Sequence, residues 1–168
     1  MESFYKFIFL FFFTIPVFTR VLAQGPAPDS YSFESAASYH RYDKDVMKCI
    51  KYIERSKPGD QDVSIKKATR FVLEWQSGCP YVHFSQNVRI DAFFGDSPQL
   101  RIYYICGYVK YALKNEGRND KVGCTYSGIQ SVLRAYGRLS VKKDKNIEDW
   151  VKLEEQGKLK SWVEERLN

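Results

Sequence analysis

The spacing of apolar and polar residues along the chain predicts helices. From Ser97 to Gly117 the apolar residues point in every direction around a helix of 3.6 residues per turn, and only three basic residues interrupt them. A helix that is apolar all round is buried on most sides. Ser97 and Pro98 are typical of a helix start, and Gly117 is typical of a helix end. We therefore expect a buried central helix over about 98–116.

Amphipathic patterns predict the helices around it, because apolar residues recur on one face at helical spacing. A loose helical turn after Ser35 is ambiguous. The stretch 80–96 is different, since its β-branched and aromatic residues favour an extended or hairpin-like connection. The fold class is thus all-α, a compact bundle of five or six helices. The helices expected around the central one cover 43–56, 64–77, 121–136, a segment from 147 to about 156, and 159–167.

The N-terminus has the three-part layout of a secretory signal peptide. Lys6 precedes an apolar run from Phe7 to Phe18, and Val21-Leu22-Ala23 supplies the small or modest residues of a cleavage site. Twelve helical residues rise about 18 Å, short of a bilayer core of about 30 Å, so a cleaved signal is favoured over an anchor. We expect export to a periplasmic or extracellular location, with no stable membrane anchor after cleavage.

The rest of the chain is expected to be one domain. Residues 1–23 form the predicted signal, and 24–34, rich in Gly, Pro and Ser, is predicted to be a flexible leader. Residues 35–168 form a single helical domain. The formal net charge of +6 favours anionic partners only slightly. We expect no nucleic-acid partner, because the chain has neither a phosphate-binding glycine loop nor a basic and aromatic nucleic-acid module.

Three helical segments resemble a family of exported helical proteins from Bacteroidota. They are GYVKYALKN at 107–115, the stretch from Lys143 to Leu159, and FVLEW at 71–75. The resemblance covers about the last two thirds of the chain, and its motifs are general helix patterns. It implies an exported all-helical domain and supplies no catalytic residue.

Catalytic and metal signatures are absent from the sequence. A zinc site needs three or four converging ligands, but no HExxH or CxxC spacing occurs. His40 lies near Asp43 and Asp45, which is the ordinary setting of a surface histidine. A nucleophilic pair of Cys79 and His83 is a weak signal, because an activated thiolate needs an electropositive, accessible setting. We expect no enzyme activity, no metal and no cofactor.

Four cysteines remain after the predicted cleavage, so disulfides are plausible in an exported protein. If the central helix runs back toward the start of the first long helix, Cys49 faces Cys106 and Cys79 comes level with Cys124. We therefore predict the pairs Cys49–Cys106 and Cys79–Cys124. The alternative is four reduced, buried thiols that pack as small hydrophobes.

Two functions stay open. The first is a non-catalytic exported domain that binds a protein or another envelope component. The second is a carrier of a small apolar or aromatic ligand in a groove between helices lined by tyrosines. The tyrosines predicted to line that groove are Tyr103, Tyr104, Tyr108, Tyr111, Tyr126 and Tyr136. A concave pocket of several hundred cubic ångströms favours the second function, and an exposed apolar patch favours the first.

Overall fold

The structure is a computed structural model that describes residues 25–84, 94, 97–116, 120–139 and 143–167. These residues form helices and connections, with no strand among them, so the all-α prediction is confirmed. The described elements are α1 (Ala36–Arg41), α2 (Asp43–Arg55), α3 (Val63–Gly78), the short 3₁₀ helix η2 (Pro98–Leu100), α5 (Arg101–Lys114), α6 (Lys121–Tyr136), α7 (Lys145–Glu155) and α8 (Leu159–Leu167).

The described residues contain seven α-helices, one more than the upper number expected. The additional helix is α1, which forms where the sequence was ambiguous. A reciprocal capping box accounts for it: the Ser38 amide donates to Ser35 Oγ at 3.3 Å, and the Ser35 amide donates to Ser38 Oγ at 2.9 Å. Such a box satisfies two amides that a helix start otherwise leaves unpaired.

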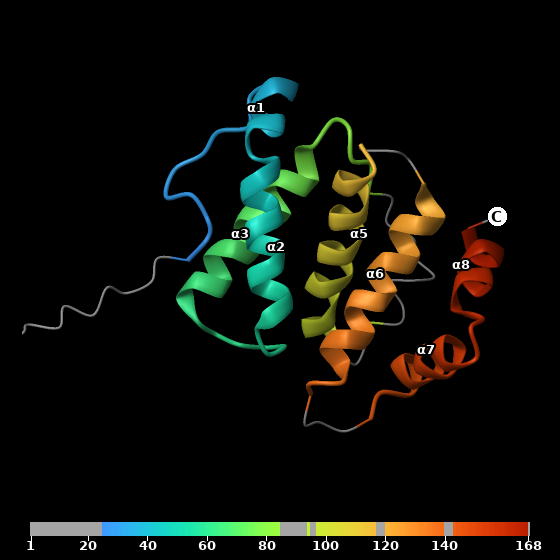
Figure 1. Cartoon of the computed structure of the whole chain (residues 1–168). Helices are drawn as coiled ribbons and strands as arrows, with labels where there is room; N and C mark the ends of the chain where they lie inside the picture. The colour runs from blue at the N-terminus through green and yellow to red at the C-terminus, as the bar shows by residue number, and fades with distance from the viewer. Residues whose placement is uncertain (1–24, 85–93, 95–96, 117–119, 140–142, 168) are drawn as a thin grey trace, which may run out of the picture.

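The central helix of the prediction is confirmed as α5, which lies between α2 and α6 (Figure 1). Eight of its fourteen residues are buried. α2 runs antiparallel to both α3 and α5, α5 runs antiparallel to α6, and α7 and α8 pack against α6 (Figure 1). Because α5 runs back toward the end of the bundle where α2 begins, the C-terminal ends of α2 and α6 lie at the same end as the start of α5.

Glycines allow α5 and α6 to approach closely. A Cβ added to Gly107 of α5 would lie 2.7 Å from Ser131 Cβ and 2.9 Å from Gly128 Cα, and it would also meet the Ser127 carbonyl oxygen. A Cβ added to Gly128 of α6 would meet the Tyr104 ring at 2.6 Å. The Ser127 hydroxyl donates to the Gly107 carbonyl at 3.0 Å. The two backbones therefore touch at a point where no larger side chain fits.

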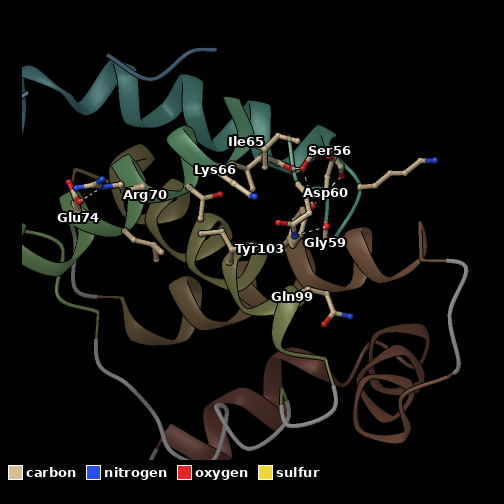
Figure 2. A pocket seen from close by; sticks show the side chains of 15 residues that line it. Ser56, Gly59, Asp60, Ile65, Lys66, Arg70, Glu74, Gln99 and Tyr103 are labelled. Carbon is tan, nitrogen blue, oxygen red and sulfur yellow. Dashed lines mark hydrogen bonds and ion pairs between the residues drawn. The ribbon is translucent and has the colours of Figure 1, made fainter. Parts of the chain in front are cut away.

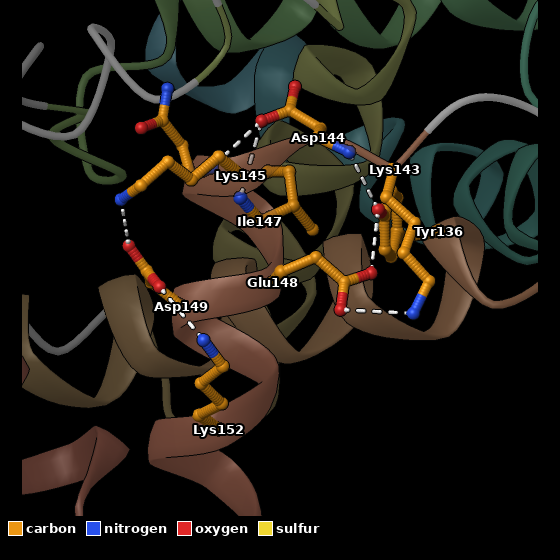
Figure 3. Close-up of polar contacts among 9 residues, drawn as sticks. Tyr136, Lys143, Asp144, Lys145, Ile147, Glu148, Asp149 and Lys152 are labelled. Atoms are coloured by element: carbon orange, nitrogen blue, oxygen red, sulfur yellow. Dashed lines mark hydrogen bonds and ion pairs between the residues drawn. The ribbon is translucent and has the colours of Figure 1, made fainter.

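The start of the central helix differs from the expectation. Ser97 makes no side-chain cap on η2; its hydroxyl donates instead to Asp144 Oδ2 at 2.7 Å. Asp144 is itself the N-cap of α7, and its amide donates to the Tyr136 hydroxyl at 2.9 Å (Figure 3). Both Ser97 and Asp144 are about 95% buried. The serine thus links the start of α5 to α7. Its hydroxyl bonds to the Asp144 carboxylate because a buried carboxylate without hydrogen-bond donors costs more free energy than a helix start without a side-chain cap.

The described part of the predicted leader, 25–34, makes packing contacts with the helices. The Tyr31 ring lies 4.7 Å from the Phe71 ring, and the Phe33 ring stacks on Tyr39 at 4.9 Å. Two aromatic side chains give this segment enough apolar surface to bury, which the Gly, Pro and Ser content concealed.

Several predictions concern residues outside the described part. They are the signal peptide at 1–23, most of the extended connection at 80–96, and the helix end at Gly117. No described helix is long and apolar enough to cross a membrane.

Candidate functional site

A cavity of about 530 Å³ lies between the turn after α2, the exposed side of α3, and the start of α5. We call it the α3–α5 groove. Its floor is apolar and comes from Ile53, Ile65, Leu73, Ile102 and Tyr103. Its rim is polar and comes from Ser56, Lys57, Asp60, Gln61, Lys66, Thr69, Arg70, Glu74 and Gln99. Figure 2 shows the labelled rim residues Ser56, Gly59 and Asp60 at one end and Arg70 and Glu74 at the other.

The turn between α2 and α3 positions one end of the groove. Gly59 has φ +81, a left-handed conformation that glycine adopts without a steric cost. The Asp60 amide donates to the Lys57 carbonyl at 3.1 Å and closes the turn. Asp62 then caps α3 by accepting from the Ser64 amide at 2.7 Å. The turn residues that end α2 in the sequence therefore also build a wall of the groove.

Tyr103 forms the base of the groove. The residue is only 2% exposed, and its hydroxyl donates to the Ser56 carbonyl at 3.1 Å and lies 3.1 Å from Ser56 Oγ. Burial raises the pKa of Tyr103, and the hydrogen bond from Ser56 opposes that shift. The phenol is therefore neutral at physiological pH and acts as a hydrogen-bonding group rather than a charge.

The opposite end carries a polar cluster anchored on Glu74. Arg70 Nε donates to Glu74 Oε1 at 2.6 Å, and the Tyr31 hydroxyl donates to Glu74 Oε2 at 2.5 Å. The hydrogen bonds from Tyr31 and Arg70 lower the pKa of Glu74. This end of the groove therefore presents an ionised carboxylate and a guanidinium at pH 7, held in place by the segment before α1.

The structure places one of the six predicted groove tyrosines, Tyr103, in this groove. Tyr104 packs against α6, and the Tyr108 hydroxyl donates to the His83 carbonyl at 2.9 Å. Tyr111 donates to Asp120 at 2.8 Å. The Tyr126 hydroxyl lies 3.3 Å from Glu154, and the Tyr136 hydroxyl donates to Glu148 at 2.9 Å. The tyrosines on α5 thus separate, because the hydroxyls of Tyr103, Tyr108 and Tyr111 bond to three different polar partners.

The predicted disulfides Cys49–Cys106 and Cys79–Cys124 are not formed: all four cysteines are free and buried. The helix direction that the pairing required is present, but each thiol packs as a small apolar side chain. Burial raises the pKa of Cys49 to about 12 and that of Cys124 to about 11, and it also raises the pKa values of Cys79 and Cys106. Protonated thiols are poor nucleophiles, so Cys79 has no activated character.

The residues around His40 form a packed cluster. It lies at the end of the bundle opposite the turn between α2 and α3 that lines the groove. The His40 ring stacks on Tyr81 at 3.9 Å, and His40 Nδ1 lies 3.2 Å from Asp43 Oδ2, as the sequence spacing indicated. Asp45 pairs with Lys48 at 2.8 Å instead. Within the described ranges, no three His, Cys, Asp or Glu side chains gather where they could hold a metal ion.

The groove residues on α3 were missed by the sequence analysis. Leu73 lies outside the stripe that α3 buries and is 37% exposed, although it lines the groove. An apolar residue on the polar side of an amphipathic helix was the available signal. Chemically, an apolar floor with neutral and charged groups at its ends can bind and orient a small amphipathic molecule.

Comparison with protein-family models, with curated proteins and with solved structures finds no match to this chain.

Proposed function

We propose that this protein is a non-catalytic carrier that binds a small ligand with an apolar or aromatic body in the α3–α5 groove. The observation that carries the proposal is the cavity of about 530 Å³ with its continuous apolar floor. Ligand pockets are concave, measure roughly 300–1,000 Å³ and combine apolar walls with a few polar groups. The groove has this composition, with Tyr103 at its base and the Arg70–Glu74 pair at one end.

A protein-binding apolar patch has less support. The large hydrophobic side chains exposed in the described residues are Tyr52, Val63 and Leu73. One of these, Leu73, belongs to the groove. The proposal therefore favours a small ligand over a protein or envelope partner.

We retain export as part of this proposal, with cleavage after Ala23. Intact-mass measurement of the exported protein should give a chain beginning at Gln24. Recovery of full-length protein only in membranes would contradict it.

The test is titration of a neutral aromatic probe, N-phenyl-1-naphthylamine, followed by its fluorescence. Leu73→Asp places a charge in the groove wall and should weaken binding by about tenfold or more, since a bound apolar ring cannot solvate it. Because Leu73 is 37% exposed, the variant should remain folded.

Val63→Asp is the matched control. It lies on the same helix, is 67% exposed, does not line the groove and receives the same charge. The control should bind like the wild type. Equal affinities for both variants, or no saturable binding by the wild type, would refute the carrier function.

A further inference from the structure

A second cavity, of about 480 Å³, shares only Tyr103 with the α3–α5 groove. It lies where the C-terminal parts of α2 and α6 meet beside α5. We call it the basic pocket, because four of its seven lining residues are cations. Its lining residues are Lys51, Glu54, Arg55, Tyr103, Ser131, Arg134 and Arg138.

The cations come in two pairs at helical spacing. Lys51 and Arg55 are four residues apart on α2, and Arg134 in the last turn of α6 is four residues before Arg138, which follows that helix. Like charges at this spacing repel each other, and here the two pairs also share one cavity. Within the described residues Lys51 and Arg55 have no ion-pair partner. These charges therefore oppose folding unless an anion lies among them.

The single carboxylate in the pocket does not neutralise them. Glu54 is 16% exposed, and its Oε2 lies 2.6 Å from Lys110 Nζ, a cation that does not line the pocket. Its Oε1 accepts from Ser131 Oγ at 3.1 Å, and Arg134 approaches it only to 3.9 Å. Lys110 already balances the charge of Glu54, so the four lining cations stay in excess.

Helix dipoles explain only part of this arrangement. Arg55 and Arg134 stand in the last turns of their helices, where a cation is favoured. Each helix C-terminus supplies about half a negative charge. Two such ends therefore offset about one of the four positive charges, and the pocket stays far from neutral. Lys51 lies a full turn earlier, and Arg138 lies beyond the end of α6.

Arg138 is held in position before any ligand arrives. Its Nη1 donates to the Glu54 carbonyl at 2.5 Å, and its guanidinium carbon lies 5.7 Å from the centre of the Tyr103 ring. A guanidinium fixed over an aromatic ring keeps further N–H groups available in a rigid fork, which suits the oxygens of a phosphate.

We propose that the basic pocket binds the phosphate group of a small organic phosphate. Four cations that line one cavity suit a dianion better than a monoanionic carboxylate. The cavity exceeds the size of a phosphate ion, so it also has room for an organic body next to Tyr103. This site is distinct from the proposed apolar groove and does not depend on it.

The test is isothermal titration with phenyl phosphate at constant ionic strength, with benzoate titrated in parallel. We expect binding at one site for phenyl phosphate, and at least about tenfold weaker binding in the double variant Lys51→Gln, Arg55→Gln, because each charged hydrogen bond contributes about that factor. Both side chains are exposed and unpaired, so the variant should fold.

The matched control is the double variant Arg41→Gln, Lys44→Gln, which removes the same charge where α1 ends and α2 begins, at the other end of α2 from the pocket. It should bind phenyl phosphate like the wild type. Binding of the naphthylamine probe should be unchanged in Lys51→Gln, Arg55→Gln, so failure here is distinguishable from failure of the groove proposal. Three results would overturn the basic-pocket site: no saturable binding of phenyl phosphate, equal loss in both double variants, or benzoate binding as tightly as phenyl phosphate.

Discussion

Replacing Gly107 by alanine should destabilise the protein, although alanine is the better helix former. In an isolated helix the substitution gains about 1 kcal/mol. Here the new methyl group would lie 2.7 Å from Ser131 Cβ and 2.9 Å from Gly128 Cα. Carbon atoms pack at about 3.5–4.0 Å, so α5 and α6 must separate by about 1 Å.

The magnitude follows from what that separation disturbs. Overpacking a core costs about 1–3 kcal/mol, sometimes more. Separation also strains the Ser127 hydrogen bond to the Gly107 carbonyl, worth about 1 kcal/mol. After the gain in helix propensity, we expect a net loss of about 2 kcal/mol. For a domain of this size that lowers the melting temperature by about 4–8 °C.

Gly137→Ala is the matched control, because the chemical change is the same. Gly137 has φ −60, and a Cβ there would meet only the Leu133 carbonyl oxygen, at 3.7 Å. This variant should be neutral or more stable by about 0.4–1 kcal/mol. Urea unfolding followed by circular dichroism gives both values. A Gly107→Ala protein as stable as the wild type would refute the close approach of α5 and α6.

Four further predictions test the core and its polar links. Ser97→Ala should cost about 1–3 kcal/mol in urea unfolding, because Asp144 Oδ2 loses its buried donor; an unchanged midpoint would contradict that link. Tyr104→Asp should cost several kcal/mol, because it buries a charge in α5, whereas Lys114→Asp at the exposed end should cost under about 1 kcal/mol; equal melting temperatures would argue against the buried central helix. The four thiols should resist a thiol reagent at pH 8 and react fully in denaturant, and fewer than four reactive thiols would indicate a disulfide. Burial raises the thiol pKa in the folded state, with the pKa of Cys49 near 12. The stability that the buried thiols contribute should therefore be fully present below the pKa of the unfolded thiol, about 8.5, and should fall as pH rises through 9 and above. A melting temperature that rises over that pH range would contradict the sign of this effect.

The helices could be predicted from the sequence because each long one keeps an uninterrupted apolar period. The helix over 121–136 was predicted to the residue, and α2 and α3 to within one residue at each end. Ser97 was misread as a cap because a serine before proline is typical of a helix start, and nothing local reveals a buried carboxylate 47 residues away.

The sites were less predictable, since they depend on which helix faces meet. Tyr103 was named among six tyrosines of equal appearance, and only the turn at Ser56 distinguishes it. Arg55 and Arg138 come together from segments 83 residues apart, which no spacing rule detects. The helix directions that the cysteine pairing assumed are present, yet helix direction alone does not decide whether thiols pair.

The claim that the α3–α5 groove binds an apolar ligand is tested most directly by amide chemical shifts in a ¹⁵N-labelled sample titrated with N-phenyl-1-naphthylamine. We expect saturable shifts at Thr69, Leu73, Gln99 and Ile102, which line the groove, and none at Trp150 of α7. Shifts that centre on α7 and α8, or shifts that never saturate, would contradict it.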